Sequence, residues 1–490
     1  MCAVDWIGIA NGAHDAFRDT IAAAAGTSRE RVAVHTLHQH DAPRCDFTAE
    51  QLLNEAGAAD LGALEGSFAR EVLVRLSAAV TDALREPQLV THAGYGEALV
   101  ERVASNRRIQ DESGKVIATR YTTCRDPKLR ALPEGIIDPT LSAVSFWNDN
   151  QPLAVFSYYA CHPQSYYRTG VPSPDFPGIA RFIRGQDMPG TLHVHFNGAG
   201  GNIGAGKFND GAKSNRMALA KRMADGMRRA LEATEKRELR PQDIGWYTTP
   251  VSLPVAEHLR VEELRGRIAD WNTADYWGGP EQLAWALRCE TGHQIDLACL
   301  KIGNTRVLHM PGELFVEYQL AAKKMRPEKN VAMAAYGDYG PGYIGTDESY
   351  GQGGYETSQR ASKVARGVEQ VLMEGVEQLL QDADEDLGNF EAELPRIPPT
   401  APNESLSKFE VAEGFEMQLV ASEPLIGTPV AMEWDAQGRL YVCEMKGYSE
   451  DRDDAISGIA LLTDRDGDGV YDDRTQFASG LLWPTALFPY

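Results

Sequence analysis

The feature that most limits the fold of this chain is an alternation through its first 382 residues. Short apolar runs, typical of buried strands, alternate with longer stretches in which apolar residues recur every three or four positions, as in helices. The predicted strands are 31–37, 153–160, 192–196 and 306–309, and the predicted helices are 66–84, 215–235, 263–271, 314–324 and 364–380. Strands that alternate with helices predict a mixed α/β fold.

The composition changes after this region. Within 383–407, the segment Glu391–Ser407 is rich in proline and polar residues, which is typical of a linker. Three short β-type runs with turns between them follow, at 416–421, 439–445 and 458–462. We therefore predict an α/β domain over residues 1–382, a linker over 383–407 and a short all-β segment over 408–490.

Composition and charge exclude several classes of protein. The net charge of −22 argues against a general nucleic-acid-binding protein, because such a protein needs basic patches. No run of about 18 apolar residues occurs, so we expect no transmembrane segment. The seven cysteines form neither a CxxC pair nor a CxxCH motif, so we expect no zinc knot and no covalently attached haem. Nothing in the composition indicates an oligomeric state.

The N-terminus lacks the basic start and the long apolar run of a signal peptide. Its first residues, MCAVDWIGIANG, read like the middle of a strand-and-helix unit. We expect that N-terminal residues are missing. The protein would be exported, to the periplasm or the exterior, if a signal peptide was lost with them.

Histidines stand where two predicted strands end. His38 and His40 are two positions apart, which on a strand places both imidazoles on one face, so that one can hold a metal while the other orients a water. His162 follows the predicted strand 153–160, and such positions often face the active site of an α/β fold. The alternatives are solvent-facing loop histidines for the first pair and a hydrogen-bonded core histidine for His162.

Other segments carry polar groups that also have ordinary structural interpretations. The loop 197–207 is rich in glycine, which lets backbone N–H groups approach a substrate, but it is not a Walker A sequence because neither Ser nor Thr follows its Gly-Lys pair. Glu313 stands at a predicted helix start, where the helix dipole also favours a carboxylate. The loop 343–356 is rich in Tyr and Gly, and its alternative is plain loop packing. His193 and His195 form a second, competing histidine pair.

The order of these motifs resembles the catalytic domain of the neutral/alkaline, non-lysosomal ceramidase family over about residues 1–380. The matching elements are HxHxxP at 38–43, HPxS at 162–165, SxDxxG at 173–178, the glycine-rich loop at 197–202, PGE at 311–313 and YIxTxExYxxxxYE at 343–356.

The resemblance implies a zinc-dependent hydrolase that acts on an amide bond of a small N-acyl or lipid-like substrate. Its implied zinc ligands, for one ion in the catalytic domain, are His38, His162, Glu313 and Tyr343. Its implied catalytic residues are His40, Arg107 and Tyr355. Imidazoles and a carboxylate are usual zinc ligands, and the charge of the metal favours a phenolate. The four ligand atoms should lie about 3–4 Å apart.

The glycine-rich loop departs from the family pattern. The family has a Gly-Asp-Val-Ser type of sequence where this chain has Gly201–Gly204 (GNIG). A serine nucleophile therefore cannot operate there, and the nearby Lys207 should be protonated at neutral pH. We predict attack on the amide carbonyl by metal-activated water, with Tyr355 and Arg107 stabilising the oxyanion. Ser165 is the alternative nucleophile.

Residues 408–490 resemble the start of the β-propeller of large, planctomycete-type membrane-bound dehydrogenase proteins with haem-binding C-terminal regions. About one blade is present, so we expect an antiparallel β unit with unpaired edges. The residues Asp464, Asp466, Asp468 and Asp472 have the spacing of a calcium loop, and an acidic hairpin turn is the alternative. For the whole chain, a non-catalytic binding relative of the same fold and a haem-associated redox protein stay open as alternatives.

Overall fold

The chain forms two compact units, Met1–Asp382 and Ala383–Tyr490. The computed structural model describes residues 1–57, 64–267, 279–381, 400–409, 411–412, 414–447 and 454–488. Among these residues, no helix is long and apolar enough to cross a membrane.

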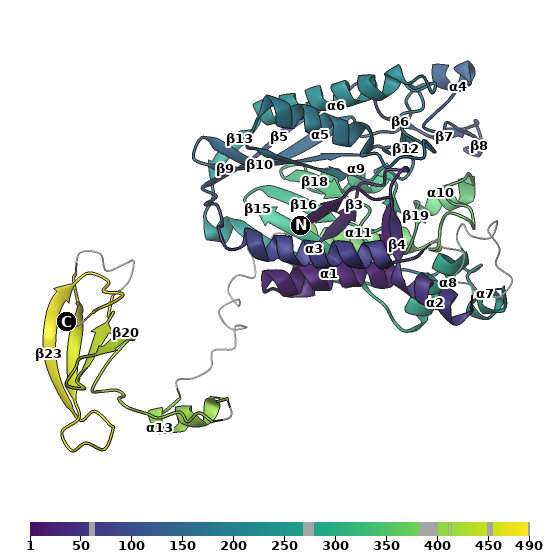
Figure 1. Cartoon of the computed structure of the whole chain (residues 1–490). Helices are drawn as coiled ribbons and strands as arrows, with labels where there is room; N and C mark the ends of the chain where they lie inside the picture. Colours follow the sequence, from purple (N-terminus) through teal and green to yellow (C-terminus); the bar gives the residue numbers. More distant parts are fainter. Residues whose placement is uncertain are drawn as a thin grey trace. The chain divides into compact units, whose positions relative to one another are not determined.

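Two mixed sheets form the centre of the first unit (Figure 1). The five-stranded sheet has the order β11 (Leu192–Asn197), β10 (Gln151–Tyr159), β9 (Thr140–Asn148), β5 (His92–Leu99) and β13 (Glu235–Glu238). The four-stranded sheet has the order β14 (Ile244–Val251), β15 (Ile295–Ile302), β16 (Thr305–His309) and β18 (Asn330–Ala334). Each sheet contains one parallel pair, β10 with β11 and β16 with β18, beside antiparallel pairs.

Helices cover the outer face of each sheet, which gives four layers in the order α/β/β/α (Figure 1). The helices α5 (Asp175–Asp187) and α6 (Ser214–Glu232) pack on the five-stranded sheet, and α9 (Val316–Met325) and α11 (Val368–Leu380) pack on the four-stranded sheet. Apolar side chains of both sheets, including Tyr158, Phe196 and Val307, form one buried cluster between them. This arrangement confirms the mixed α/β class and fixes the strand ends from which the candidate residues follow.

Further described elements surround the layers. The remaining helices of the first unit are α1 (Asn11–Ala25), α2 (Phe47–Glu55), α3 (Ser67–Ala83), α4 (Pro127–Ala131), α7 (Val261–Arg267), α8 (Gly279–Glu290) and α10 (Asp347–Gln352). The two-stranded ladders are β1 (Cys2–Val4) with β3 (Val34–Thr36), β2 (Gly8–Ala10) with β4 (Arg44–Asp46), β6 (Ser105–Asn106) with β12 (Ile203–Gly204), β7 (Arg108–Gln110) with β8 (Val116–Thr119), and β17 (Glu313–Leu314) with β19 (Tyr343–Ile344).

The structure corrects several predicted boundaries. The strand predicted at 31–37 shrinks to β3, because the chain first makes a 3-10 turn at Arg29–Arg31. The helix predicted at 364–380 begins only at Val368, because Gly367 has a left-handed backbone with φ 91°. The helix predicted from residue 314 is preceded by the short strand β17, so Glu313 lies on a strand instead of a helix start. Of the helix predicted at 263–271, the residues beyond 267 lie outside the described residues.

The second unit contains one open antiparallel sheet. Its strands follow in chain order: β20 (Pro429–Trp434), β21 (Leu440–Glu444), β22 (Ser457–Thr463) and β23 (Asp473–Leu481). The residues described here form no closed barrel or propeller, and the strand predicted at 416–421 is absent. Within the predicted linker, the described residues include a short helix, α13 (Pro402–Ser405).

Candidate metal centre

Four segments far apart in the sequence carry the predicted zinc ligands to one place. His38 follows β3, and His162 follows the interior strand β10. Glu313 and Tyr343 begin the short strands β17 and β19, which pair in parallel with these two residues opposite each other. This two-residue ladder fixes the carboxylate beside the phenol, and the ends of β3 and β10 bring the imidazoles to them.

His38 reaches the site by a backbone conformation that the strand argument did not foresee. Strand β3 ends at Thr36, and His38 has φ 65°, in the left-handed region. The expectation that His38 and His40 share one face of a strand is therefore wrong. A tight turn instead brings their rings to a centroid distance of 4.9 Å, and His162 lies 4.9 Å from His38 on another side.

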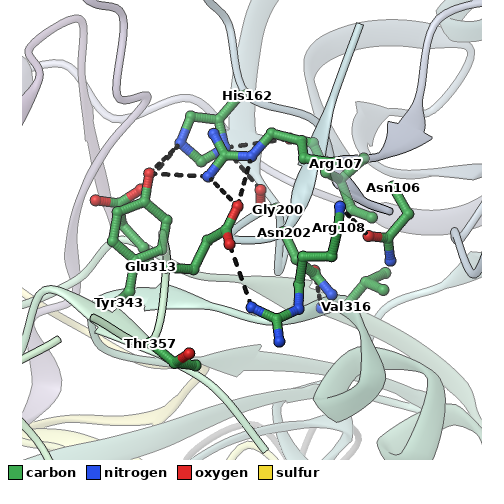
Figure 2. A network of polar contacts seen from close by, with 12 residues as sticks. Asn106, Arg107, Arg108, His162, Gly200, Asn202, Glu313, Val316, Tyr343 and Thr357 are labelled. Atoms are coloured by element: carbon green, nitrogen blue, oxygen red, sulfur yellow. Dashed lines mark hydrogen bonds and ion pairs between the residues drawn. The ribbon is translucent and has the colours of Figure 1, made fainter. Parts of the chain in front are cut away.

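The donor atoms of the four residues lie close together. Glu313 Oε2 is 3.3 Å from His38 Nε2 and 2.9 Å from His162 Nε2. The hydroxyl of Tyr343 is 3.3 Å from His162 Nε2 (Figure 2). The side chains of both histidines and of Glu313 are almost fully buried. These separations resemble those between the ligands of one bound ion.

Backbone carbonyl groups orient both imidazoles. His38 Nδ1 donates to Ile7 O at 2.6 Å, and His162 Nδ1 donates to Gly200 O at 2.7 Å (Figure 2). Because a carbonyl oxygen only accepts, Nδ1 of each ring carries a proton, and in the neutral form of the ring Nε2 directs a lone pair at Glu313. His38 Nε2 has no hydrogen-bond donor among the described residues. An oxygen of Glu313 and an Nε2 lone pair thus face each other as two acceptors. The cluster needs a cation between them, which is either a proton or a metal ion.

Electrostatics favour ligand-competent protonation states. Burial disfavours the charged form of Glu313, but His38 and His162 hold the pKa of this carboxyl well below its usual range. Burial, followed by the charge of Arg107, lowers the pKa of His162 to about 4. Glu313 is therefore an anion and His162 a neutral imidazole at pH 7. Tyr339 donates its hydroxyl to Glu313 Oε1 at 2.6 Å and leaves Oε2 directed at the histidines.

His40 lies beside this cluster with a different orientation. Gln164 Nε2 donates to His40 Nδ1 at 3.2 Å, so the neutral ring carries its proton on Nε2. Burial, followed by the charge of His38, lowers the pKa of His40 well below its usual range. Ligand atoms of His38, His40 and His162 all lie within 4.8 Å of one another. His40 can therefore donate from Nε2 to a group held at the centre.

Arg107 borders the centre through Tyr343. Its Nη2 donates to the Tyr343 hydroxyl at 3.1 Å (Figure 2). The same Nη2 also donates to Glu356 Oε1 at 3.0 Å. Glu356 is fully buried, and its second oxygen accepts from Arg108 at 3.2 Å. Burial raises the pKa of Tyr343 well above its usual range, and Arg107 opposes this rise. The arginine thus stabilises a tyrosine oxygen that keeps a lone pair for a cation.

Tyr355 stands at the edge of the same site. Its ring centroid lies 5.7 Å from that of Tyr343, and its side chain is 37% exposed. Burial raises its pKa, so it carries its proton at neutral pH and can donate. Both Tyr355 and Arg107 line a cavity that reaches His40.

The glycine-rich loop supports the centre instead of a phosphate. A Cβ at Gly201 would lie 2.3 Å from the backbone oxygen of Glu313, so only glycine lets the two chains approach this closely. At Gly204, where the family has serine, a Cβ would lie 2.9 Å from Thr122 Oγ1 and 3.2 Å from Arg107 Cδ. The loop therefore orients His162 and packs against Arg107.

Hydrogen bonds occupy both Lys207, which was expected to be inert, and Ser165, the alternative nucleophile. Lys207 Nζ donates to the backbone oxygens of Arg130 and Leu132, at 3.1 and 2.5 Å. Ser165 Oγ donates to Asp175 Oδ1 at 2.5 Å, beside the start of α5. His162, whose nitrogens face Gly200 and Glu313, forms no hydrogen bond to Ser165 among the described contacts.

The second histidine pair and the acidic turn, which are the other two candidate metal sites, differ in whether their side chains lie close together. Among the described residues, neither His193 nor His195 joins a group of three potential metal ligands, and His195 Nδ1 contacts Ser157 Oγ at 3.0 Å. In the turn between β22 and β23, the carboxylates of Asp464, Asp466 and Asp468 lie within 4.8 Å of one another.

Asp472 is outside this acidic group and accepts a hydrogen bond from Arg465 N at 3.3 Å. Asp464 also accepts from the backbone N–H groups of Gly467 and Gly469. Calcium binding by this turn stays a prediction.

Sequence reasoning missed three residues that hold the site together. Glu356 closes the tyrosine motif as its last residue, but nothing in that pattern shows that it joins two arginines. Tyr339 and Gln164 hydrogen bond to Glu313 and His40, respectively.

Comparison with known proteins shows the class of fold. A ceramidase complexed with C2 is similar with a TM-score of 0.53 and 15% identity, over 97% of this chain and 80% of that chain. The neutral ceramidase from Pseudomonas aeruginosa is similar with a TM-score of 0.52 and 15% identity, over 95% of this chain and 79% of that chain. The chain thus has a fold similar to that of the neutral ceramidases.

The C-terminal segment has a separate match. Residues 401–490 match a family model described as a domain of unknown function (DUF7133). No curated protein matches the chain.

Proposed function

We propose that the first unit is a zinc-dependent hydrolase of amide bonds that uses metal-activated water. The observation that carries the proposal is the buried cluster of acceptors at His38, His162 and Glu313, with separations of 2.9 and 3.3 Å and the Nδ1 proton of each ring directed outward. A buried carboxylate that faces two imidazole lone pairs is unfavourable without a cation. Nitrogen and oxygen ligands in this number suit zinc.

The proposed ligands are His38, His162, Glu313 and Tyr343. When bound there, zinc would polarise the substrate carbonyl and lower the pKa of a water molecule. His40 holds that water by donation from Nε2 and stays neutral because of burial. A neutral imidazole at this position also accepts a proton after a shift of tautomer.

In this proposal, Tyr355 and Arg107 donate to the carbonyl oxygen, on which negative charge would develop. Tyr355 keeps its phenolic proton, and Arg107 keeps its positive charge because Tyr343 and Glu356 stabilise the guanidinium. Fixed donors in a site shielded from water stabilise an oxyanion more than they stabilise the neutral carbonyl. The fold similarity to neutral ceramidases supports an amide as the scissile bond.

Metal analysis and hydrolysis of N-acyl compounds test the proposal together. Purified protein should contain about one zinc per chain, a chelator should abolish hydrolysis, and added zinc should restore it. Glu313→Ala should lose both zinc and activity. The control is His92→Ala, at the first residue of β5, which should keep both the zinc and the activity.

The nucleophile needs its own reagent. A serine-directed phosphonate should leave hydrolysis unchanged, because Ser165 is bound to Asp175 and no serine stands at residue 204. Inactivation by the phosphonate together with resistance to the chelator would refute the metal-water mechanism.

A further inference from the structure

A cleft opens beside the metal centre and reaches His38, Glu313 and Tyr343. Its volume is about 300 Å³, and a second cavity of about 430 Å³ adjoins it through His40 and Tyr355. The first cavity is walled by tyrosines and charged side chains, and Ile7 and Ala361 are its only aliphatic side chains among the described residues. Beside these two residues, the apolar surface of the wall comes from aromatic rings and from the stems of charged side chains, so polar groups accompany it throughout.

A buried ammonium group lies in this wall. Lys363 is 5% exposed, and its Nζ donates to Gly340 O at 3.0 Å and lies 5.8 Å from the ring centroid of Tyr339. Within the described part of the chain, no carboxylate pairs with it. The buried carboxyl of Asp46 interacts electrostatically with Lys363, but it accepts its hydrogen bonds from Asn11 and from the N-terminus of α2. A buried cation without an anionic partner is costly, so a ligand that supplies the anion binds favourably.

Two more cations stand at the mouth of the cleft. Arg360 and Arg168 are exposed, and neither guanidinium forms an ion pair with a described residue. Of the other charged residues of the wall, Arg44 pairs with Glu281 at 3.5 Å, and Glu313 adds one negative charge at the metal centre. The cleft is therefore positive in a chain whose net charge is −22. A positive cleft in an acidic protein concentrates anions from solution.

We propose that Lys363 and Arg360 bind an anionic group of the substrate, so that this protein acts on short N-acyl compounds that carry a carboxylate or a phosphate. This inference rests on the proposed hydrolase function and specifies its substrate class. The anion pairs with the buried ammonium at the floor, and Arg360 closes over it from the mouth. The amide bond, a few bonds away, then reaches the metal centre through the same cleft, past Tyr339 and Tyr343.

Three matched probes test the inference: N-hexanoylglycine, its uncharged analogue N-hexanoylglycinamide, and N-hexanoylethanolamine phosphate. We expect kcat/KM for one of the anions to exceed that for the uncharged amide by about tenfold or more, since a hydrogen bond to a charged group contributes roughly 1.5–3 kcal/mol. The better anion identifies carboxylate or phosphate as the recognised group. Equal kcat/KM for all three, or faster hydrolysis of a long-chain ceramide, would overturn the inference.

Variants assign the effect to the named residues. Arg360→Gln should reduce the anion-to-neutral ratio about tenfold, and because Arg360 is exposed, this change leaves the fold intact. Lys363→Met should reduce the ratio further if the variant folds. Arg75→Gln removes an exposed arginine from α3, outside the cleft, and should leave the ratio unchanged. An unchanged ratio in Arg360→Gln would count against the anion site.

Binding without turnover separates the two proposals. Calorimetry with the Glu313→Ala variant measures the affinity for N-hexanoylglycine and for its amide without hydrolysis. If wild-type protein hydrolyses no amide but the variant prefers the anion, the hydrolase function fails and the anion site stands. If wild-type protein hydrolyses amides but the variant shows no preference, the anion site fails and the hydrolase function stands.

Discussion

Replacement of Glu356 by alanine should destabilise the first unit more than any single surface change. This carboxylate is fully buried and accepts from Arg107 Nε and Nη2 at 3.2 and 3.0 Å and from Arg108 Nη1 at 3.2 Å. Both arginine side chains are themselves 3% exposed. Glu356→Ala therefore leaves two buried guanidinium groups beside an empty volume.

The size of the effect follows from this geometry. Loss of one partner of a buried ion pair costs about 3–5 kcal/mol. A unit of 382 residues unfolds with an entropy of roughly 0.8 kcal/mol/K, at about 2.1 cal/mol/K per residue. The midpoint of thermal unfolding should thus fall by about 4–6 °C. Glu356→Gln keeps the shape and one acceptor oxygen, so its decrease should be smaller.

Circular dichroism during heating of chelator-treated protein measures this effect without a contribution from bound metal. The control is Glu71→Ala on α3, which removes a carboxylate that is 66% exposed and lies 3.6 Å from Arg75. Such a surface pair contributes at most about 1 kcal/mol, so the control should shift the midpoint by about 1 °C or less. If the unfolding midpoint of Glu356→Ala equals that of the control, the two arginines do not depend on this carboxylate, and the reasoning is refuted.

Three further predictions address the ligands, the second unit and pH. In His162→Ala, the zinc content measured by mass spectrometry should fall from about one per chain to near zero. His40→Ala should keep the metal and lose about 10²–10⁴-fold in kcat. Loss of zinc from His40→Ala would instead show that His40 is a ligand. Deletion of 408–490 should leave the zinc content unchanged, and a loss would show that the units form one domain. Burial, followed by the charge of Glu281, raises the pKa of Asp46 to about 7. The folded state therefore binds the proton of this carboxyl more tightly than the unfolded state does, and stability falls as pH rises from about 4 to 7. Between pH 5 and pH 8, the free energy of unfolding of Asp46→Asn, measured with urea, should therefore rise by about 2–4 kcal/mol relative to that of the wild type. The same dependence of this free energy on pH in both proteins would exclude the raised pKa.

The strands and helices of the first unit were largely predictable because they follow local hydrophobic spacing. The predicted strand 153–160 corresponds to β10, and the predicted helix 66–84 corresponds to α3. The packing of two sheets face to face was not predictable, because their shared cluster joins side chains from Ala93 to Ala334 and no local pattern encodes such distant contacts.

The candidate site was predictable only in part for the same reason. Motif order indicated which residues meet, but the means by which they meet depends on tertiary contacts. The register of Glu313 with Tyr343 arises from strands of two residues, too short to leave a periodic signal. The role of Glu356 requires two arginines that lie 248 and 249 positions away in the sequence.

The left-handed backbone at His38 has a consequence for mutational tolerance. Residues other than glycine hold this conformation at a cost of about 1–3 kcal/mol, and β-branched residues hold it least readily. A glycine at this position would relieve the backbone strain but would leave the volume of the buried ring empty. In a saturation library, glycine and asparagine should therefore be tolerated better than β-branched residues, while all of them lose function. Free imidazole added to the His38→Gly protein should then enter the vacated space and restore part of the activity.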